Sequence, residues 1–197
     1  MQFIIIGPAR AGKSTVGAAL AAAFETAATD TSAPLVDIET ERQVLVAEGK
    51  AKSMGADPLH LLHLMHTAGG MWDGSRNRPA RTLLVALGDA LKKGMGATAL
   101  VDACFARGGV CVGVRRKDEL LAACQKYPLA RVLWVDRPGV TGEGDDNFDI
   151  PLEWADYFYN NKGDLEEVAA FALFVRDSVR MGWLPEPRTD LAIELRR

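Results

Sequence analysis

The chain has 197 residues, of which 48% are hydrophobic and 25% charged, and this composition is typical of a globular domain rather than of a disordered or coiled-coil protein. Its 23 basic and 26 acidic residues leave a net charge of −3, which gives no electrostatic reason to expect a nucleic-acid partner. No apolar run approaches the roughly 20 residues of a membrane helix, so we expect no membrane partner either.

The cysteines and the start of the chain bear on the compartment. Cys104, Cys111 and Cys124 form no Cys-x-x-Cys pair, and we expect reduced, mostly buried thiols. The first residues lack the basic and apolar regions of a secretory leader. Both observations predict a cytoplasmic protein.

Strands and helices alternate along the predicted chain. Phe3–Ile6 is an apolar run typical of a strand buried on both faces. Four further strands are predicted at 35–36, 110–114, 131–135 and 157–159. Helices are predicted at 14–26, 39–48, 81–93, 98–107 and 117–125, and a last helix begins after a capping-box pattern formed by Asp164 and Glu167. This alternation predicts a single α/β domain over residues 1–197, with a five-stranded parallel sheet in a three-layer fold.

Two segments depart from this alternation. Residues 50–80 carry few readable signals, and residues 38–80 are interpreted as an insertion that binds an acceptor molecule. Residues 137–150 are rich in Gly and Asp and poor in apolar residues, which predicts a loop able to close as a lid.

The most specific pattern is Gly7-Pro8-Ala9-Arg10-Ala11-Gly12-Lys13-Ser14. It matches the phosphate-loop motif G-x-x-x-x-G-K-[ST] at every position, and it lies between a predicted strand and a predicted helix, as that motif requires. Glycines permit a tight turn in which successive backbone N–H groups face a phosphate, and the helix N-terminus adds a positive dipole end.

The motif assigns a role to each of its residues. Gly7, Arg10, Ala11 and Gly12 supply the backbone that surrounds the phosphates of ATP. Lys13 bridges the outer phosphates, the Ser14 hydroxyl joins the Mg²⁺ shell, and Thr15 adds a contact to the inner phosphate. The sequence therefore predicts the fold of the P-loop NTPases, with ATP and Mg²⁺ as ligands.

Three further stretches resemble phage-type deoxynucleoside monophosphate kinases, a family within the P-loop nucleoside monophosphate kinases. Residues 79–84 with Leu87-Gly88-Asp89 resemble the Arg-x-x-Leu helix of that family. Residues 114–119 (Val-Arg-Arg-Lys-Asp-Glu) resemble its Asp-Val-Arg-Phe-x-Asn-Glu segment, and residues 156–163 resemble its closing Asp-x-x-Ile-x-Asn-x-Gly turn. Gly113 departs from the pattern, because the family has an Asp there. The resemblance implies a monomer or homodimer that phosphorylates a nucleoside monophosphate, located in the host cytoplasm if a phage encodes it.

A second resemblance points to a different acceptor. Val36-Asp37-Ile38-Glu39, with Arg42-Gln43-Val44 and Glu48-Gly49, resembles the second strand and following helix of dephospho-coenzyme A kinases. In that family an Asp after the strand assists the acceptor hydroxyl, which makes Asp37 the corresponding residue here. Asp37 could instead orient a phosphate acceptor, hold Mg²⁺ through water, or cap a helix.

Arginines are the other candidates, because phosphoryl transfer depends on positioning and on neutralising charge. The first resemblance implies that Arg81 and Arg115 bind the acceptor phosphate and the transferred charge, with Arg116 as a neighbour able to replace Arg115. Arg137 follows a predicted strand and could clamp the donor phosphates. Trp72 and Arg76 form an aromatic and basic loop that suits stacking on a base. Each arginine could also be a surface residue in a weak ion pair.

The sequence thus predicts ATP- and Mg²⁺-dependent phosphoryl transfer to a (deoxy)nucleoside monophosphate. A small-molecule hydroxyl kinase and a nucleotide-binding protein without enzymatic activity remain as alternatives. Asn161 and Gly163 are interpreted as a turn near the donor adenine.

Overall fold

The computed structural model of the chain describes residues 1–35, 85, 88–89, 91–140 and 148–183. The described residues form β1 (Phe3–Ile6), α1 (Lys13–Ala23), β2 (Ala28–Asp30), α5 (Ala99–Phe105), β3 (Val110–Val112), α6 (Lys117–Lys126), β4 (Arg131–Asp136), a 3₁₀ turn (Leu152–Trp154), β5 (Tyr157–Asn160) and α7 (Leu165–Arg180). Among them no helix is long and apolar enough to cross a membrane.

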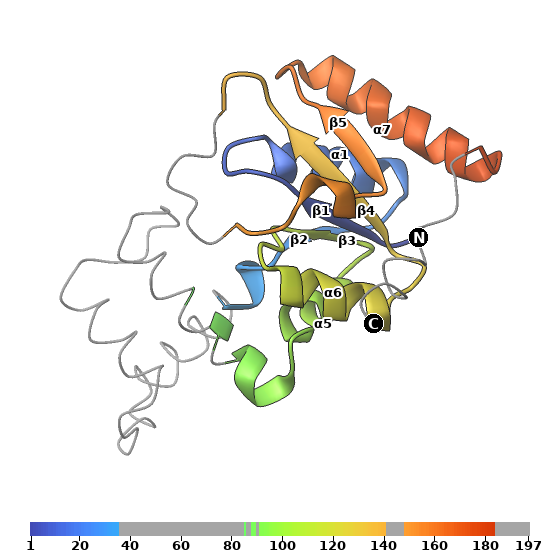
Figure 1. Cartoon of the computed structure of the whole chain (residues 1–197). Helices are drawn as coiled ribbons and strands as arrows, with labels where there is room; N and C mark the ends of the chain where they lie inside the picture. Colours follow the sequence, from blue (N-terminus) through green and yellow to red (C-terminus); the bar gives the residue numbers. More distant parts are fainter. Residues whose placement is uncertain (36–84, 86–87, 90, 141–147, 184–197) are drawn as a thin grey trace, which may run out of the picture. The chain divides into compact units, whose positions relative to one another are not determined.

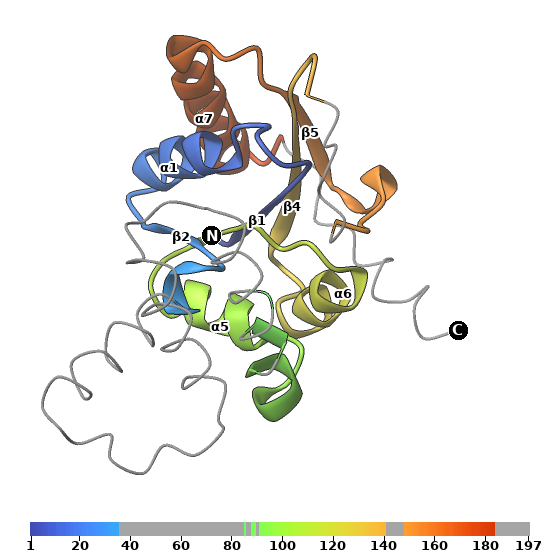
Figure 2. The same ribbon diagram turned by 90° about the vertical axis from the view of Figure 1, so that its left-hand side faces the viewer.

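The five strands form one sheet in the order β2-β3-β1-β4-β5, and every neighbouring pair is parallel. Helices α1 and α7 cover one face, and α5 and α6 cover the other (Figures 1 and 2). The α/β class and the five-stranded parallel sheet are therefore confirmed.

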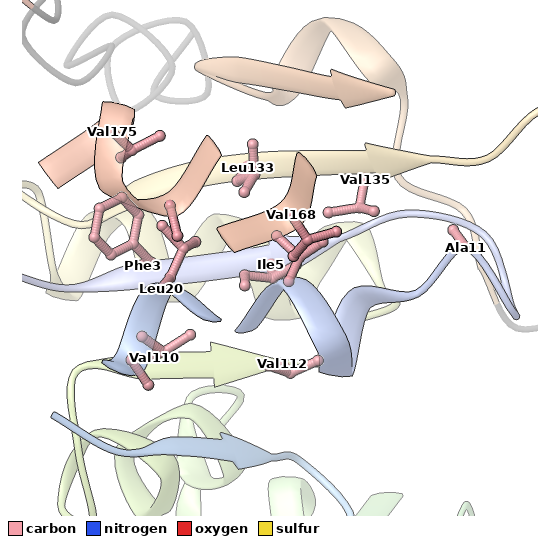
Figure 3. Packing of buried hydrophobic residues seen from close by; sticks show 13 residues of the cluster. Phe3, Ile5, Ala11, Leu20, Val110, Val112, Leu133, Val135, Val168 and Val175 are labelled. Carbon is pink, nitrogen blue, oxygen red and sulfur yellow. The ribbon is translucent and has the colours of Figure 1, made fainter. Parts of the chain in front are cut away.

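Each face of the sheet has its own core. On one face, residues of the central strands pack under α1 and α7, as Figure 3 shows for Ile5, Leu20, Val135 and Val168. On the other face, Ile4 and Ile6 pack against Val101 and Leu120 of α5 and α6. All four side chains of β1 are at most 1% exposed, which explains why this strand is an unbroken apolar run.

The second strand is the clearest error of the sequence analysis. Leu35 does not belong to a strand but to a helical turn at residues 33–35, while Val36 lies outside the described residues. The strand is instead Ala28–Asp30, which pairs with β3 through Ala28–Val110, Thr29–Cys111 and Asp30–Val112. The acidic residue at the end of the second strand is therefore Asp30 and not Asp37.

Other boundaries shift by a few residues. Helix α1 ends at Ala23 and not at Thr26, and β3 ends at Val112, because Gly113 has a φ of 99° that leaves the extended conformation. Helix α7 begins where the capping pattern placed it, and the Asp164 side chain accepts a hydrogen bond from the Glu166 backbone N–H at 2.8 Å.

By its internal contacts the chain divides into two units, one formed by residues 1–31 and 101–197 and the other by residues 32–100. The sheet belongs to the first unit. The insertion interpreted at residues 38–80 lies outside the described residues. The helical prediction for 81–93 is confirmed at the positions described there, residues 85, 88–89 and 91–93.

Candidate functional site

The loop between β1 and α1 has the backbone conformation that its glycines allow. Gly7 and Gly12 have φ values of 134° and 89°, and Arg10 between them has a φ of 65°. A Cβ on Gly7 would lie 2.1 Å from the carbonyl oxygen of Val135 on β4. Because that neighbour is backbone and cannot move aside, the loop can leave β1 along this path only if residue 7 is glycine.

Lys13 reaches back across the loop from the first turn of α1. Its Nζ donates hydrogen bonds to the carbonyl oxygens of Gly7, at 2.8 Å, and Pro8, at 2.6 Å. Ser14 and Thr15 are exposed in the same helical turn, and the Val16 N–H begins the helix by donating to the Gly12 carbonyl oxygen at 3.0 Å. An ammonium group, a helix N-terminus and two exposed hydroxyls therefore share one small region.

Asn161, the residue directly after β5, holds the loop through hydrogen bonds of its side chain. This side chain is 3% exposed, donates to the Ala11 carbonyl oxygen at 2.7 Å and accepts from the Gly163 N–H at 2.9 Å. Its amide nitrogen lies 2.1 Å from the position that a Cβ on Gly12 would occupy. Asn161 was interpreted as a turn residue only, and its hold on the loop was missed, although Asn161 and Gly163 lie in one of the stretches that carry the family resemblance.

The ends of the other strands meet the loop at the carboxyl edge of the sheet, where open parallel sheets bind ligands. Arg115 follows β3 and is half-buried, as is Arg116, the residue before α6, which forms an ion pair of 4.0 Å with Asp149. Arg137 follows β4 and is exposed, and its Nη2 lies 3.0 Å from the position of a Cβ on Gly163. The structure thus brings Arg115, Arg116 and Arg137 to the same edge as the phosphate loop.

The ends of β2 and β3 carry a second group of residues that sequence reasoning did not single out. The Thr31 N–H donates to the Val112 carbonyl oxygen at 2.8 Å, and the Thr31 hydroxyl donates to that of Gly113 at 3.2 Å. The Gly113 N–H donates to the Ile5 carbonyl oxygen at 3.1 Å. Asp30 and Thr31 are therefore held beside β3 and Gly113, and Gly113 in turn is bonded to β1, the strand that leads into the phosphate loop.

Four predicted site residues, Asp37, Trp72, Arg76 and Arg81, lie outside the described residues. Of the lid predicted at 137–150, residues 137–140 and 148–150 are described and contain no helix or strand.

The thiols behind the site are shielded from solvent, as expected. Cys104 and Cys111 are buried, Cys124 is half-buried, and all three are free. A hydrogen bond to Cys104, together with burial, raises the pKa of Cys111 well above its usual range. Burial raises the pKa of Cys124 to about 12. Cys111 and Cys124 therefore stay protonated at neutral pH and lack the thiolate that nucleophilic chemistry requires.

The chain matches no protein-family model and no curated protein. The functional argument therefore depends on the geometry at the carboxyl edge. That geometry suits an anion with several phosphate groups: the N-terminus of α1 and Lys13 lie at the phosphate loop, and arginines follow the two strands beside β1.

Proposed function

We propose that the chain is a phosphotransferase with the P-loop NTPase fold, which transfers the γ-phosphoryl group of ATP to a (deoxy)nucleoside monophosphate. The observation that carries this proposal is the loop from Gly7 to Ser14, in which the full sequence motif coincides with a tight backbone turn and with a lysine folded over that turn.

The residues present fit the donor nucleotide. The Val135 backbone approaches residue 7 so closely that only glycine fits there. The glycine of the motif is therefore required by the fold and is not a chance occurrence. In the complex, the loop amides bind the outer phosphates, and Lys13 exchanges part of its contact with the loop carbonyls for phosphate oxygens.

The exposed Ser14 hydroxyl fits Mg²⁺, which prefers oxygen ligands and retains several waters. When bound, Mg²⁺ neutralises charge on the phosphates. Ser14 is the described residue that the motif assigns to it.

The transfer step needs positioning more than proton chemistry. A phosphate oxygen of the acceptor forms a bond to the γ-phosphorus, the bond from that phosphorus to the bridging oxygen breaks, and ADP leaves with the electron pair. The attacking oxygen is already ionised, so no general base is required. Arg115, with Arg116 beside it, would hold the acceptor phosphate, and Arg137 would contact the donor phosphates. Arg81, Trp72 and Arg76 keep their expected roles toward the acceptor.

One observation favours a hydroxyl acceptor as the second candidate. A carboxylate, that of Asp30, ends β2, which is the position where a hydroxyl kinase needs a base. We expect this alternative to be active with dephospho-coenzyme A and inactive with monophosphates.

The deciding experiment measures ADP release from Mg²⁺-ATP with a panel of ribo- and deoxynucleoside monophosphates and dephospho-coenzyme A. We expect release with one or a few monophosphates, and a loss of about 100-fold in Lys13→Ala because a cation at the developing charge is removed. The matched control is Lys126→Ala, which removes an exposed lysine at the far end of α6 and should retain activity. ATP binding without release for any acceptor would contradict the proposal and favour a nucleotide-binding protein.

A further inference from the structure

Asp30 lies on the face of the sheet that α1 covers. It pairs with Val112 of β3, and residues paired across a parallel ladder point to the same face. Val112 belongs to the core under α1, and its Cγ2 lies 2.7 Å from the position of a Cβ on Gly17 of that helix. Helix α1 begins at the carboxyl edge, so the Asp30 carboxylate and the Ser14 hydroxyl lie on the same face at the same edge.

The other described acidic residue at a strand end of this edge points the opposite way. Asp136 ends β4 directly after Val135, which packs in the core under α1 and α7. Because side chains alternate along a strand, Asp136 faces the α6 side. Asp30 is therefore the strand-end carboxylate, among the residues that the structure describes, that shares the face of the phosphate loop and its helix.

Gly113 leaves room for this carboxylate. A Cβ on Gly113 would lie 3.6 Å from both Asp30 carboxylate oxygens and 3.1 Å from the Thr31 hydroxyl. A second carboxylate at position 113 would stand against the first, and like charges at such distances repel. Because position 113 is a glycine, the carboxylate at the ends of β2 and β3 is that of Asp30 on β2.

We propose that Asp30 binds the Mg²⁺ of the Mg²⁺-nucleotide complex, directly or through one of its waters, together with Ser14. This inference rests on the proposed function, because it needs a nucleotide in the phosphate loop. The chemistry fits, since Mg²⁺ is usually held by one or two carboxylates or hydroxyls plus phosphates and waters. Thr31, bonded to the Gly113 carbonyl oxygen, fixes the backbone next to Asp30.

The test measures Mn²⁺, a paramagnetic substitute for Mg²⁺, by electron paramagnetic resonance with the full chain and a non-hydrolysable ATP analogue. We expect Asp30→Asn to weaken Mn²⁺ affinity in the nucleotide complex by about 10- to 100-fold. Nucleotide affinity measured in EDTA should stay within about twofold, because the phosphate contacts of the loop are unchanged. Asp136→Asn, the matched carboxylate on the opposite face, should leave Mn²⁺ affinity unchanged.

Each outcome has a defined meaning. Unchanged Mn²⁺ affinity in Asp30→Asn would overturn the inference and leave the proposed function standing; if turnover with a hydroxyl acceptor were then lost, Asp30 would be that acceptor's base. A wild-type chain that binds no nucleotide would overturn the proposed function as well. If Asp30→Asn fails to fold by circular dichroism, Asp30→Glu and Asp30→Ala decide: the first should keep Mn²⁺ binding and the second should lose it.

Discussion

The phosphate loop has two different neighbours in the sheet. On the side of β4 and β5, the loop has two close contacts: the Val135 backbone carbonyl oxygen stands against Gly7, and the buried Asn161 amide donates a hydrogen bond to the Ala11 carbonyl oxygen. On the side of β3 and β2, Gly113 donates a hydrogen bond to Ile5 of β1, and Thr31 and Asp30 beside Gly113 offer a hydroxyl and a carboxylate. The comparison indicates that one side fixes the shape of the loop, while the other side supplies side chains for chemistry.

The largest effect is expected where the loop meets β4. Gly7→Ala would place a Cβ 2.1 Å from a backbone oxygen at a φ of 134°, so we expect a loss of about 3 kcal/mol or more in the free energy of unfolding. Urea unfolding followed by circular dichroism measures it. Gly139→Ala is the matched control, because Gly139 also has a positive φ, of 79°, but a Cβ there meets nothing within 4 Å. If the two variants lost the same free energy of unfolding, the close approach of β4 would not be the reason why residue 7 is glycine.

A double-mutant cycle can measure the interaction between Gly12 of the loop and Asn161, which follows β5. Asn161→Ala removes two hydrogen bonds from a buried amide, and we expect a cost of about 1–3 kcal/mol. Gly12→Ala introduces a Cβ whose contacts within 4 Å, at 2.1 and 3.4 Å, are both with the Asn161 side chain. The double variant should therefore lose less stability than the sum of the single ones. Additive losses would show that the two positions do not interact.

The β4–β5 side also shows where sequence reasoning reached its limit. The motif predicted the loop, its lysine and its helix from a few adjacent residues, and the structure has all three. The Asn161–Ala11 hydrogen bond joins residues 150 positions apart, and no local pattern records such a contact.

The misplaced second strand has a local cause. Helix α1 ends in a turn in which the Thr26 N–H donates to the Ala21 carbonyl oxygen and the Glu25 N–H to that of Ala22, with Glu25 at a φ of 53°. This is the Schellman arrangement, which usually places glycine at the left-handed position. Because this position is a glutamate, the sequence has no glycine to indicate where the helix ends. The three-residue strand β2 was consequently overlooked, and with it the role of Asp30.

A smaller effect is expected on the β3 side. Gly113→Ala keeps a φ of 99°, and the atoms nearest to its Cβ are the Thr31 hydroxyl, at 3.1 Å, and the Asp30 oxygens, at 3.6 Å. We expect a loss of about 1–2 kcal/mol from backbone strain alone, measured by the same urea titration. If the loss equalled that of Gly7→Ala, the two sides of the loop would be equally rigid and the contrast between them would fail.

The smallest effect is expected at Tyr127, at the C-terminal end of α6, on neither side of the phosphate loop. It concerns how the stability of the protein changes at alkaline pH. Burial and the hydrogen bond from the Tyr127 hydroxyl to Asp102, at 2.6 Å, raise the pKa of Tyr127 to about 12. The unfolded chain releases this proton near pH 10 and the folded chain near pH 12. The stabilisation is therefore complete below pH 10 and is lost as the pH rises from 10 to 12.

Tyr127→Phe should make unfolding less dependent on pH in that window. At pH 8 it should cost only about 0.5–1 kcal/mol, because Lys126 still pairs with Asp102 at 2.7 Å. Tyr159, whose pKa is also raised by burial, contributes equally to both proteins and cancels in the comparison. The measurement is urea unfolding from pH 8 to 12 for the wild type and the variant. If the wild type and the variant lost stability equally above pH 10, ionisation of Tyr127 would not be the cause of the loss of stability at alkaline pH.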